Sequence, residues 1–101
     1  MISTEIISRV LCSVQGCLLG RVTPNLRAVF VLIEKENEYK LIFYYHEELS
    51  EEEEELASLV DTEFIADFPS PNYKTQCSIH ILPYPENITQ SRFCVYKRYE
   101  G

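Results

Sequence analysis

One segment, residues 47–68 with the sequence EELSEEEEELASLVDTEFIADF, constrains the fold more than any other part of this chain. Ser50 and Glu53 have the spacing of a capping box, in which each side chain accepts a hydrogen bond from the other residue's backbone N–H, so a helix is predicted to begin after Ser50. Glutamates fill its first turns, where the helix dipole tolerates negative charge. Apolar residues then recur at every fourth position, at Leu56, Val60 and Phe64. This pattern predicts a helix with one face in a core and an acidic face outside it.

A second amphipathic helix is predicted over residues 3–18. Its apolar residues recur at spacings of three and four, as in a helix that packs one stripe against a core. Ser3 is a candidate N-cap, and Gly20 can adopt the left-handed conformation found just past helix ends. Gly16 lies inside the last turns, where glycine is unfavourable, so either the helix ends early or a neighbouring backbone comes close.

Four runs rich in β-branched and aromatic residues predict strands. Residues 27–34 form an almost continuous apolar run, as expected of a central strand that is covered on both faces. After a turn at residues 35–38, the run 39–46 places its odd-numbered aromatic and apolar residues on one face. The runs 77–82 and 92–99 are expected to pair with each other as a second hairpin.

The order of these elements, α-β-β-α-β-β, predicts an α+β fold with a four-stranded, mainly antiparallel sheet packed by two helices. At 101 residues the chain is expected to form a single domain, residues 1–101. No basic segment follows Met1, and no apolar run approaches the roughly 20 residues that span a bilayer. We therefore expect a cytoplasmic protein that has no membrane partner.

The whole chain has a formal net charge of -7, and its acidic residues are concentrated in one part of the sequence. Residues 34–67 hold 13 acidic and two basic residues, whereas the rest of the chain holds three acidic and seven basic ones. A nucleic-acid partner is not expected, because phosphate binding requires clustered Lys and Arg. One strongly negative surface is expected instead, and it would speed association with a cationic protein. The predicted partner-binding residues are Glu47, Glu48, Glu51, Glu52, Glu54, Glu55 and Asp61.

Two other interpretations of the acidic helix remain open. Its charged face can be merely solvated, as most such faces are. Alternatively, the chain is a non-enzymatic regulatory or structural protein that forms a homodimer through a tyrosine-rich sheet face. Tyrosine occurs seven times and is common at binding hot spots, although core packing explains most of these residues equally well.

No catalytic residues are predicted. A nucleophile needs a base that a third group holds within hydrogen-bond reach, and no cysteine or serine here lies on a recognisable nucleophile turn. His46 and His80 are therefore interpreted as surface residues of two strands, and a small hydrolase is the weakest alternative. With three glycines in the chain, a glycine-rich phosphate loop is also absent from the sequence.

The four cysteines are not expected to hold a metal, and no cofactor is predicted. Cys12 and Cys17 point in different directions on one helix, so they cannot readily share a metal or a disulfide. Cys77 and Cys94 lie on strands expected to be neighbours, but a zinc site needs four convergent ligands. Reduced, mostly buried thiols are expected of a cytosolic protein.

Three stretches of the sequence resemble a known family: residues 15–29 (QGCLLGRVTPNLRAV), residues 43–68, and the ILPYP motif at residues 81–85. They are similar to immunity proteins of bacterial contact-dependent growth inhibition systems, small proteins with the order helix, hairpin, helix, hairpin. The resemblance implies a non-enzymatic inhibitor that binds and blocks the C-terminal domain of a toxin delivered by a neighbouring cell. Such toxins are often nucleases with basic clefts, which an acidic surface can occupy in competition with the phosphate backbone. This sequence differs from the family mainly in its longer uninterrupted glutamate run and its extra cysteines, which leaves the identity of the toxin open. The family has no catalytic residues to carry over.

Overall fold

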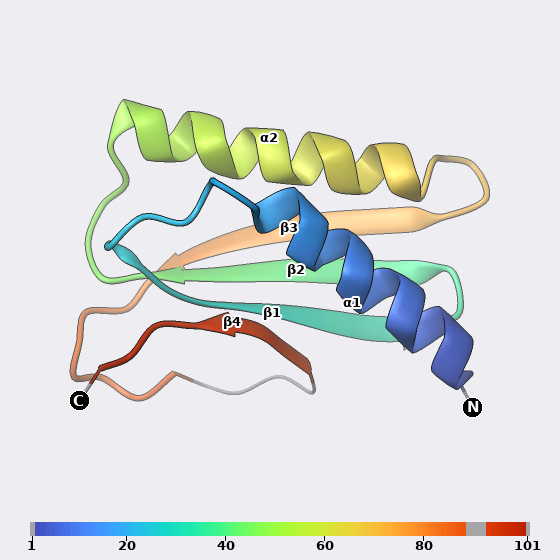
Figure 1. Cartoon of the computed structure of the whole chain (residues 1–101), viewed down its shortest axis with the longest axis horizontal. Coiled ribbons are helices and arrows are strands. Elements are labelled where there is room, and N and C mark those ends of the chain that lie inside the picture. The colour runs from blue at the N-terminus through green and yellow to red at the C-terminus, as the bar shows by residue number, and fades with distance from the viewer. Residues whose placement is uncertain (1, 89–92, 101) are drawn as a thin grey trace.

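The structure is a computed structural model that describes residues 2–88 and 93–100. It has the predicted α+β fold, with two helices and a four-stranded sheet (Figure 1). Arg92, the predicted first residue of the last strand, lies outside the described residues. The elements are α1 (Thr4–Leu18), β1 (Leu26–Lys35), β2 (Glu38–Tyr45), α2 (Glu51–Asp67), β3 (Lys74–Ile81) and β4 (Phe93–Lys97).

Both ends of α1 lie where the sequence predicts them. The Oγ atom of Ser3 accepts a hydrogen bond from the backbone N–H of Ile6 at 3.2 Å, which confirms the predicted N-cap. Gly20 has a φ of +74°, the left-handed conformation expected just after the helix. Neither explanation for Gly16 holds, because the helix continues to Leu18 and a Cβ at Gly16 would have no described atom within 4 Å outside the helix's own backbone.

The sheet has the strand order β3-β2-β1-β4. β1 is central, as predicted, and pairs antiparallel with β2 and β4, whereas β3 pairs parallel with β2. The predicted hairpin of the last two strands is therefore wrong, since β3 and β4 lie on opposite edges. The helical crossover through α2 returns the chain to the start of β2, which gives a parallel neighbour. The last strand, β4, lies at the other edge of the sheet, beside β1 (Figure 1).

Both helices pack on one face of the sheet and enclose the main core. In β2 the residues facing the helices are Tyr39, Leu41, Phe43 and Tyr45, which confirms the predicted alternation. The apolar face of α2 is also as predicted, with Ala57, Val60 and Phe64 buried against that side. Burying one such large side chain contributes roughly 1.5–3 kcal/mol. Both helices therefore contribute to one core, and the burial of the apolar side of α2 leaves its acidic side facing away from that core.

The other face of the sheet carries a smaller apolar cluster. Phe30 and Ile42 are only 1% and 8% exposed there, because Leu32, Tyr44 and Ile88 pack over them. The ring of Tyr44 also stacks on His80 of β3, with 5.3 Å between ring centroids. On the face of the sheet that the helices leave open, side chains of the sheet and of the segment after β3 thus cover the central apolar residues.

Candidate partner-binding site

The predicted capping box fixes the start of α2. The Oγ atom of Ser50 accepts from the backbone N–H of Glu53 at 3.1 Å, and the Glu53 carboxylate accepts from the backbone N–H of Ser50 at 3.1 Å. Glu53 also accepts from the Thr23 hydroxyl at 2.5 Å and the Asn25 amide at 3.3 Å. Burial alone would raise the pKa of Glu53, but these hydrogen bonds lower it. Glu53 is therefore occupied within the protein, as its assignment to the cap implies.

Replacement of Ser50 by alanine is expected to reduce the free energy of unfolding by about 1 kcal/mol, because the N–H of Glu53 loses its acceptor. Urea unfolding followed by circular dichroism measures this change. Ser58→Ala is the matched control, since Ser58 is exposed in the middle of α2 and its replacement should change stability by less than about 0.5 kcal/mol. Equal effects of the two substitutions would contradict the role of the cap.

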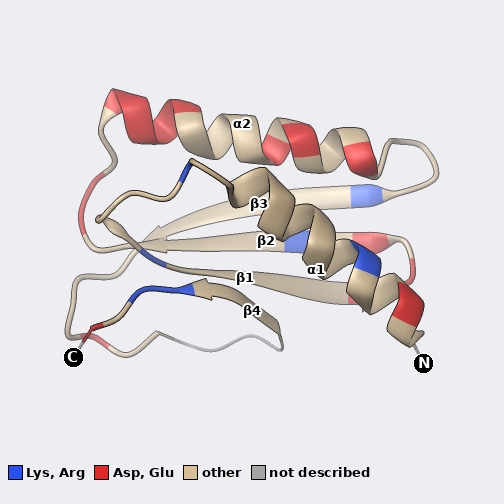
Figure 2. Cartoon of the chain, in the orientation of Figure 1, with Lys and Arg blue, Asp and Glu red and all other residues tan. Residues whose placement is uncertain are grey.

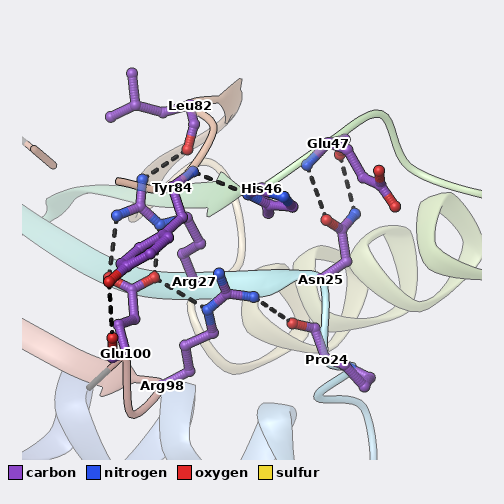
Figure 3. A network of polar contacts seen from close by, with 9 residues as sticks. All are labelled: Pro24, Asn25, Arg27, His46, Glu47, Leu82, Tyr84, Arg98 and Glu100. Atoms are coloured by element: carbon purple, nitrogen blue, oxygen red, sulfur yellow. Dashed lines mark hydrogen bonds and ion pairs between the residues drawn. The ribbon is translucent and has the colours of Figure 1, made fainter. Parts of the chain in front are cut away.

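Asn25 anchors the loop that leads into α2. Its side-chain oxygen accepts from the backbone N–H of Glu47 at 2.8 Å, and its side-chain nitrogen donates to the carbonyl of Glu47 at 2.9 Å (Figure 3). On the other side of this loop, the Nδ1 atom of His46 accepts from the backbone N–H of Tyr84 at 2.8 Å. The loop is therefore held in place at its base, while the side chain of Glu47 stays exposed.

Six of the seven predicted residues lie at the end of the molecule where α2 begins. Glu47 and Glu48 are in the loop after β2, and the others occupy the first two turns of α2 (Figure 2). All six side chains are exposed, and none forms an ion pair with a described Lys, Arg or His. We call this group the acidic patch: Glu47, Glu48, Glu51, Glu52, Glu54 and Glu55.

Asp61, the seventh predicted residue, lies apart from the acidic patch. It follows Glu54 by seven residues, about two helical turns, so both are on the same side of α2. Asp61 is only half-exposed, and burial raises the pKa of its carboxyl group. Its charge in turn contributes to raising the pKa of Cys77, which places Asp61 beside β3. The predicted set thus combines an exposed cluster at the start of α2 with one half-exposed carboxylate farther along the helix.

The acidic residues do not form the one continuous surface that their spacing suggested. Glu34, Glu36 and Glu38 lie in or beside the β1–β2 hairpin, at the opposite end of the sheet from the start of α2 (Figures 1 and 2). Glu38 is also close to Lys35, with 3.6 Å between the charged atoms. The chain therefore has two separate acidic ends, and six of the seven predicted residues lie at the end where α2 begins.

A hollow of about 530 Å³ lies beside the acidic patch and was not predicted. Arg98 is the cationic side chain on its wall, but it already donates to the carbonyl of Pro24 at 2.6 Å and to Glu100 at 3.0 Å. The residues that line the hollow come from three separate segments of the chain, so no local pattern could have found it. They are Thr23, Pro24, Asn25, His46, Glu47, Ser50, Glu52, Glu53 and Arg98.

The C-terminal residues are joined to β1 by an ion pair that was also not predicted. Arg27 is only 3% exposed, and it donates to Glu100 from two nitrogens at 2.7 and 3.0 Å. It donates as well to the carbonyl of Leu82 at 2.6 Å and lies over the ring of Tyr84 (Figure 3). The hydrogen bonds from Arg27 lower the pKa of Glu100 to about 2. Arg27 and Glu100 are 73 residues apart in sequence, so only the fold brings them together.

The positions of the cysteines correct two expectations. Cys77 and Cys94 are on opposite edges of the sheet and are not neighbours. Only Cys17 is buried, whereas Cys77 is half-buried and Cys12 and Cys94 are exposed, so the thiols are not mostly buried. All four are free thiols. Burial raises the pKa of Cys77 to about 11, which keeps this thiol protonated and poorly nucleophilic at neutral pH.

The described part of the chain contains no group of three or more His, Cys, Asp or Glu residues that could hold a metal ion. Neither described helix combines the length and the apolar character that crossing a membrane requires.

Comparison with known protein families identifies a match. A family model described as MafI2 immunity protein matches residues 7–100, which is nearly the whole chain and includes the acidic patch, α2 and all four strands. No curated protein matches the chain.

Proposed function

The chain belongs to the MafI2 immunity protein family, and from this premise we propose that it binds and neutralises a cognate toxin by covering the toxin's basic surface or active site. The partner would be the C-terminal domain of a contact-dependent growth inhibition toxin, and its chemistry would be that of a nuclease. The protein would act without catalysis, in the cytoplasm of the cell that it protects. The acidic patch would be the part that meets the toxin.

One observation carries this proposal: the acidic patch is exposed and has no ion pair within the described chain. Other carboxylates of this protein have internal partners. Glu53 caps α2, Glu63 pairs with Arg21, and Glu100 pairs with Arg27 and Arg98. The patch therefore differs from these residues in being available to an outside cation.

The physical effect of such a patch suits an inhibitor of a nuclease. A cleft that binds a phosphate backbone is lined with Lys and Arg, and a cluster of carboxylates is attracted to the same groups. Several like charges held together also produce a long-range field, which raises the rate of encounter with a cationic protein. The anchoring of the loop by Asn25 and of the helix by Ser50 and Glu53 keeps these charges together before the partner arrives.

A homodimer through the sheet face is the second candidate, and it has less support. Phe30 and Ile42 on that face are already covered by the protein's own side chains, so a second copy would not bury them further. Sedimentation at several concentrations tests this candidate, since a homodimer would show a mass that rises with concentration.

The proposed function is tested by coexpression with the product of the adjacent gene. If that product is the toxin, its C-terminal domain alone should stop bacterial growth and degrade nucleic acid, and this chain should restore growth and form a stable complex with it. Failure to bind or to restore growth, with both proteins soluble, would refute the pairing. Inhibition without a complex, for example through modification of the toxin, would refute the non-catalytic mechanism.

A further inference from the structure

The two edges of the sheet differ in how well they are protected. β4 is short, five residues, its pairing with β1 contains a register shift, and Lys97 and Arg98 follow one another at its end. Short length, irregular pairing and basic residues are common ways to prevent an edge from pairing with another strand. β3 is eight residues long, pairs with β2 without a register shift, contains no proline, and has its single Lys at its first position. β3 is thus a regular edge without these protections.

The backbone of β3 directs half of its polar groups away from the sheet. The N–H of Lys74 donates to the carbonyl of Asn37 at 2.8 Å, and that of Leu82 donates to the carbonyl of Tyr45 at 2.8 Å. Residues in a parallel strand point their N–H and C=O groups alternately to its two sides, so the even-numbered residues face β2. Among the described strands β2 alone pairs with β3, which leaves the outward groups without a ladder partner. The outward-facing residues are Thr75, Cys77, Ile79 and Ile81.

The side chains along this edge provide apolar surface. Ile79 and Ile81 are in register with Phe43 and Tyr45 of β2, whose side chains face the helices, so the two isoleucines lie on the helix side of the sheet. They are 44% and 45% exposed, although their partners on β2 are buried. A strand added beside β3 would cover them.

The charges beside this edge favour a cationic segment over a second copy of this chain as the strand that binds there. Glu54 and Asp61 lie on the side of α2 nearest to β3, and α2 runs along the same edge of the sheet (Figure 1). Side chains of an added strand that point to the helix side would meet these carboxylates. A second copy of this chain would bring its own Glu54 and Asp61 to the same place, and like charges would oppose the pairing. A cationic segment would be attracted.

We propose that β3 receives an extended segment of the toxin as a fifth strand of the sheet. On the helix side, this segment carries apolar residues against Ile79 and Ile81 and Lys or Arg toward Glu54 and Asp61. Main-chain hydrogen bonds supply affinity in this mode of recognition, and the side-chain pockets supply specificity. The inference rests on the proposed function, because it assigns the binding mode of the same partner, while the acidic patch guides the encounter.

Amide hydrogen exchange, resolved by residue, tests the added strand in the unmodified protein. In the free chain the amides of Thr75, Cys77, Ile79 and Ile81 should exchange quickly, whereas the neighbouring amides that bond to β2 exchange slowly. In the complex with the adjacent gene's toxin domain, the four outward amides should slow by about tenfold or more. Unchanged exchange at these amides in a complex that does form would overturn the inference and leave the proposed function intact. Protection already present in a free dimer would show that a second copy occupies the edge.

A pair of substitutions at Ile79 distinguishes the contribution of the backbone to toxin affinity from the contribution of the side chain. Ile79→Pro and Ile79→Ala both remove the isoleucine, but only proline removes the outward N–H, which takes no part in the pairing with β2. The proline variant should bind the toxin domain about 30-fold more weakly than the alanine variant, because a hydrogen bond is lost and the ring blocks the incoming strand. Calorimetric titration measures both affinities, and thermal unfolding checks that both variants fold. Equal affinities of two folded variants would contradict an added strand.

Discussion

Reversing three charges of the acidic patch, in the triple variant Glu51→Lys, Glu52→Lys and Glu55→Lys, is expected to slow association with the toxin domain by about 100-fold at low salt. The patch attracts a basic surface over a distance of about 10 Å at moderate ionic strength, so its effect falls mainly on the association rate. The dissociation rate should change much less. Stopped-flow mixing over a range of salt concentrations measures both the rate and its salt dependence, which should become flat or reverse in the variant. Glu54 stays unchanged, because it lies on the same side of α2 as Asp61, where the added strand is proposed to bind.

A matched variant distinguishes the effect of the position of the charges on the association rate from the effect of the net charge. Glu5 lies at the start of α1, and Glu34 and Glu36 lie in or beside the β1–β2 hairpin, at the opposite end of the molecule from the start of α2 (Figure 1). All three are exposed, and replacing them by lysine changes the net charge by the same amount. This control should slow association only slightly. Equal slowing by the two triple variants would mean that net charge alone guides the encounter, and no slowing by the first would remove the patch from the binding site.

Replacement of Glu100 by glutamine is expected to reduce the free energy of unfolding at pH 7 by about 2–3 kcal/mol. The substitution keeps the shape of the side chain and removes its charge, which leaves the guanidinium of Arg27 buried without a counter-charge. Removing one member of a buried ion pair is costly for this reason. Glu100 is still 16% exposed, so water reduces the loss compared with a fully buried pair. Urea unfolding measures the change, and Glu86→Gln, an exposed carboxylate near Arg27, is the control with little expected effect.

The same ion pair gives a prediction for acid unfolding. The pKa of Glu100 is lowered from an ordinary value of 4.5 to about 2, because hydrogen bonds from Arg27 favour the charged form. A lowered pKa means that the stabilisation is complete above pH 4.5 and is lost as the pH falls toward 2. The difference in stability between the natural protein and Glu100→Gln should therefore shrink over this interval. A difference that stayed constant from pH 7 to pH 2 would contradict the assigned ionisation.

The most accurate predictions from sequence concern interactions between residues close together in the chain. Ser50 and Glu53 form the capping box, Ser3 caps α1, and Gly20 takes the left-handed conformation. Each of these features depends on a few neighbouring residues whose spacing is visible in the sequence. The alternation in β2 and the apolar stripe of α2 were also predicted correctly, because the period of the side chains follows directly from strand and helix geometry.

Strand pairing was the main error, and it has a physical cause. The segments of β3 and β4 look like a hairpin because they are consecutive strands joined by a loop with turn residues. The β1–β2 hairpin has two free edges, one on β2 and one on β1, and each can accept either of the two later segments. The second edge of β1 needs a strand as a hydrogen-bonding partner, and β4 provides it. No local pattern shows which edge each segment takes, so the expectation that Cys77 and Cys94 lie on neighbouring strands was wrong as well.

The sequence by itself determined the order of the elements, the position of the helix caps and the gathering of the acidic patch, because helix periodicity and adjacency in the chain set all three. Only the tertiary structure decided that Asp61 lies beside β3, that Glu34, Glu36 and Glu38 lie at the far end, and that Arg27 pairs with Glu100. It also decided that β3 has an open edge. These features depend on which strand occupies which edge of the sheet, and that choice is made by the burial of the whole core rather than by any one segment.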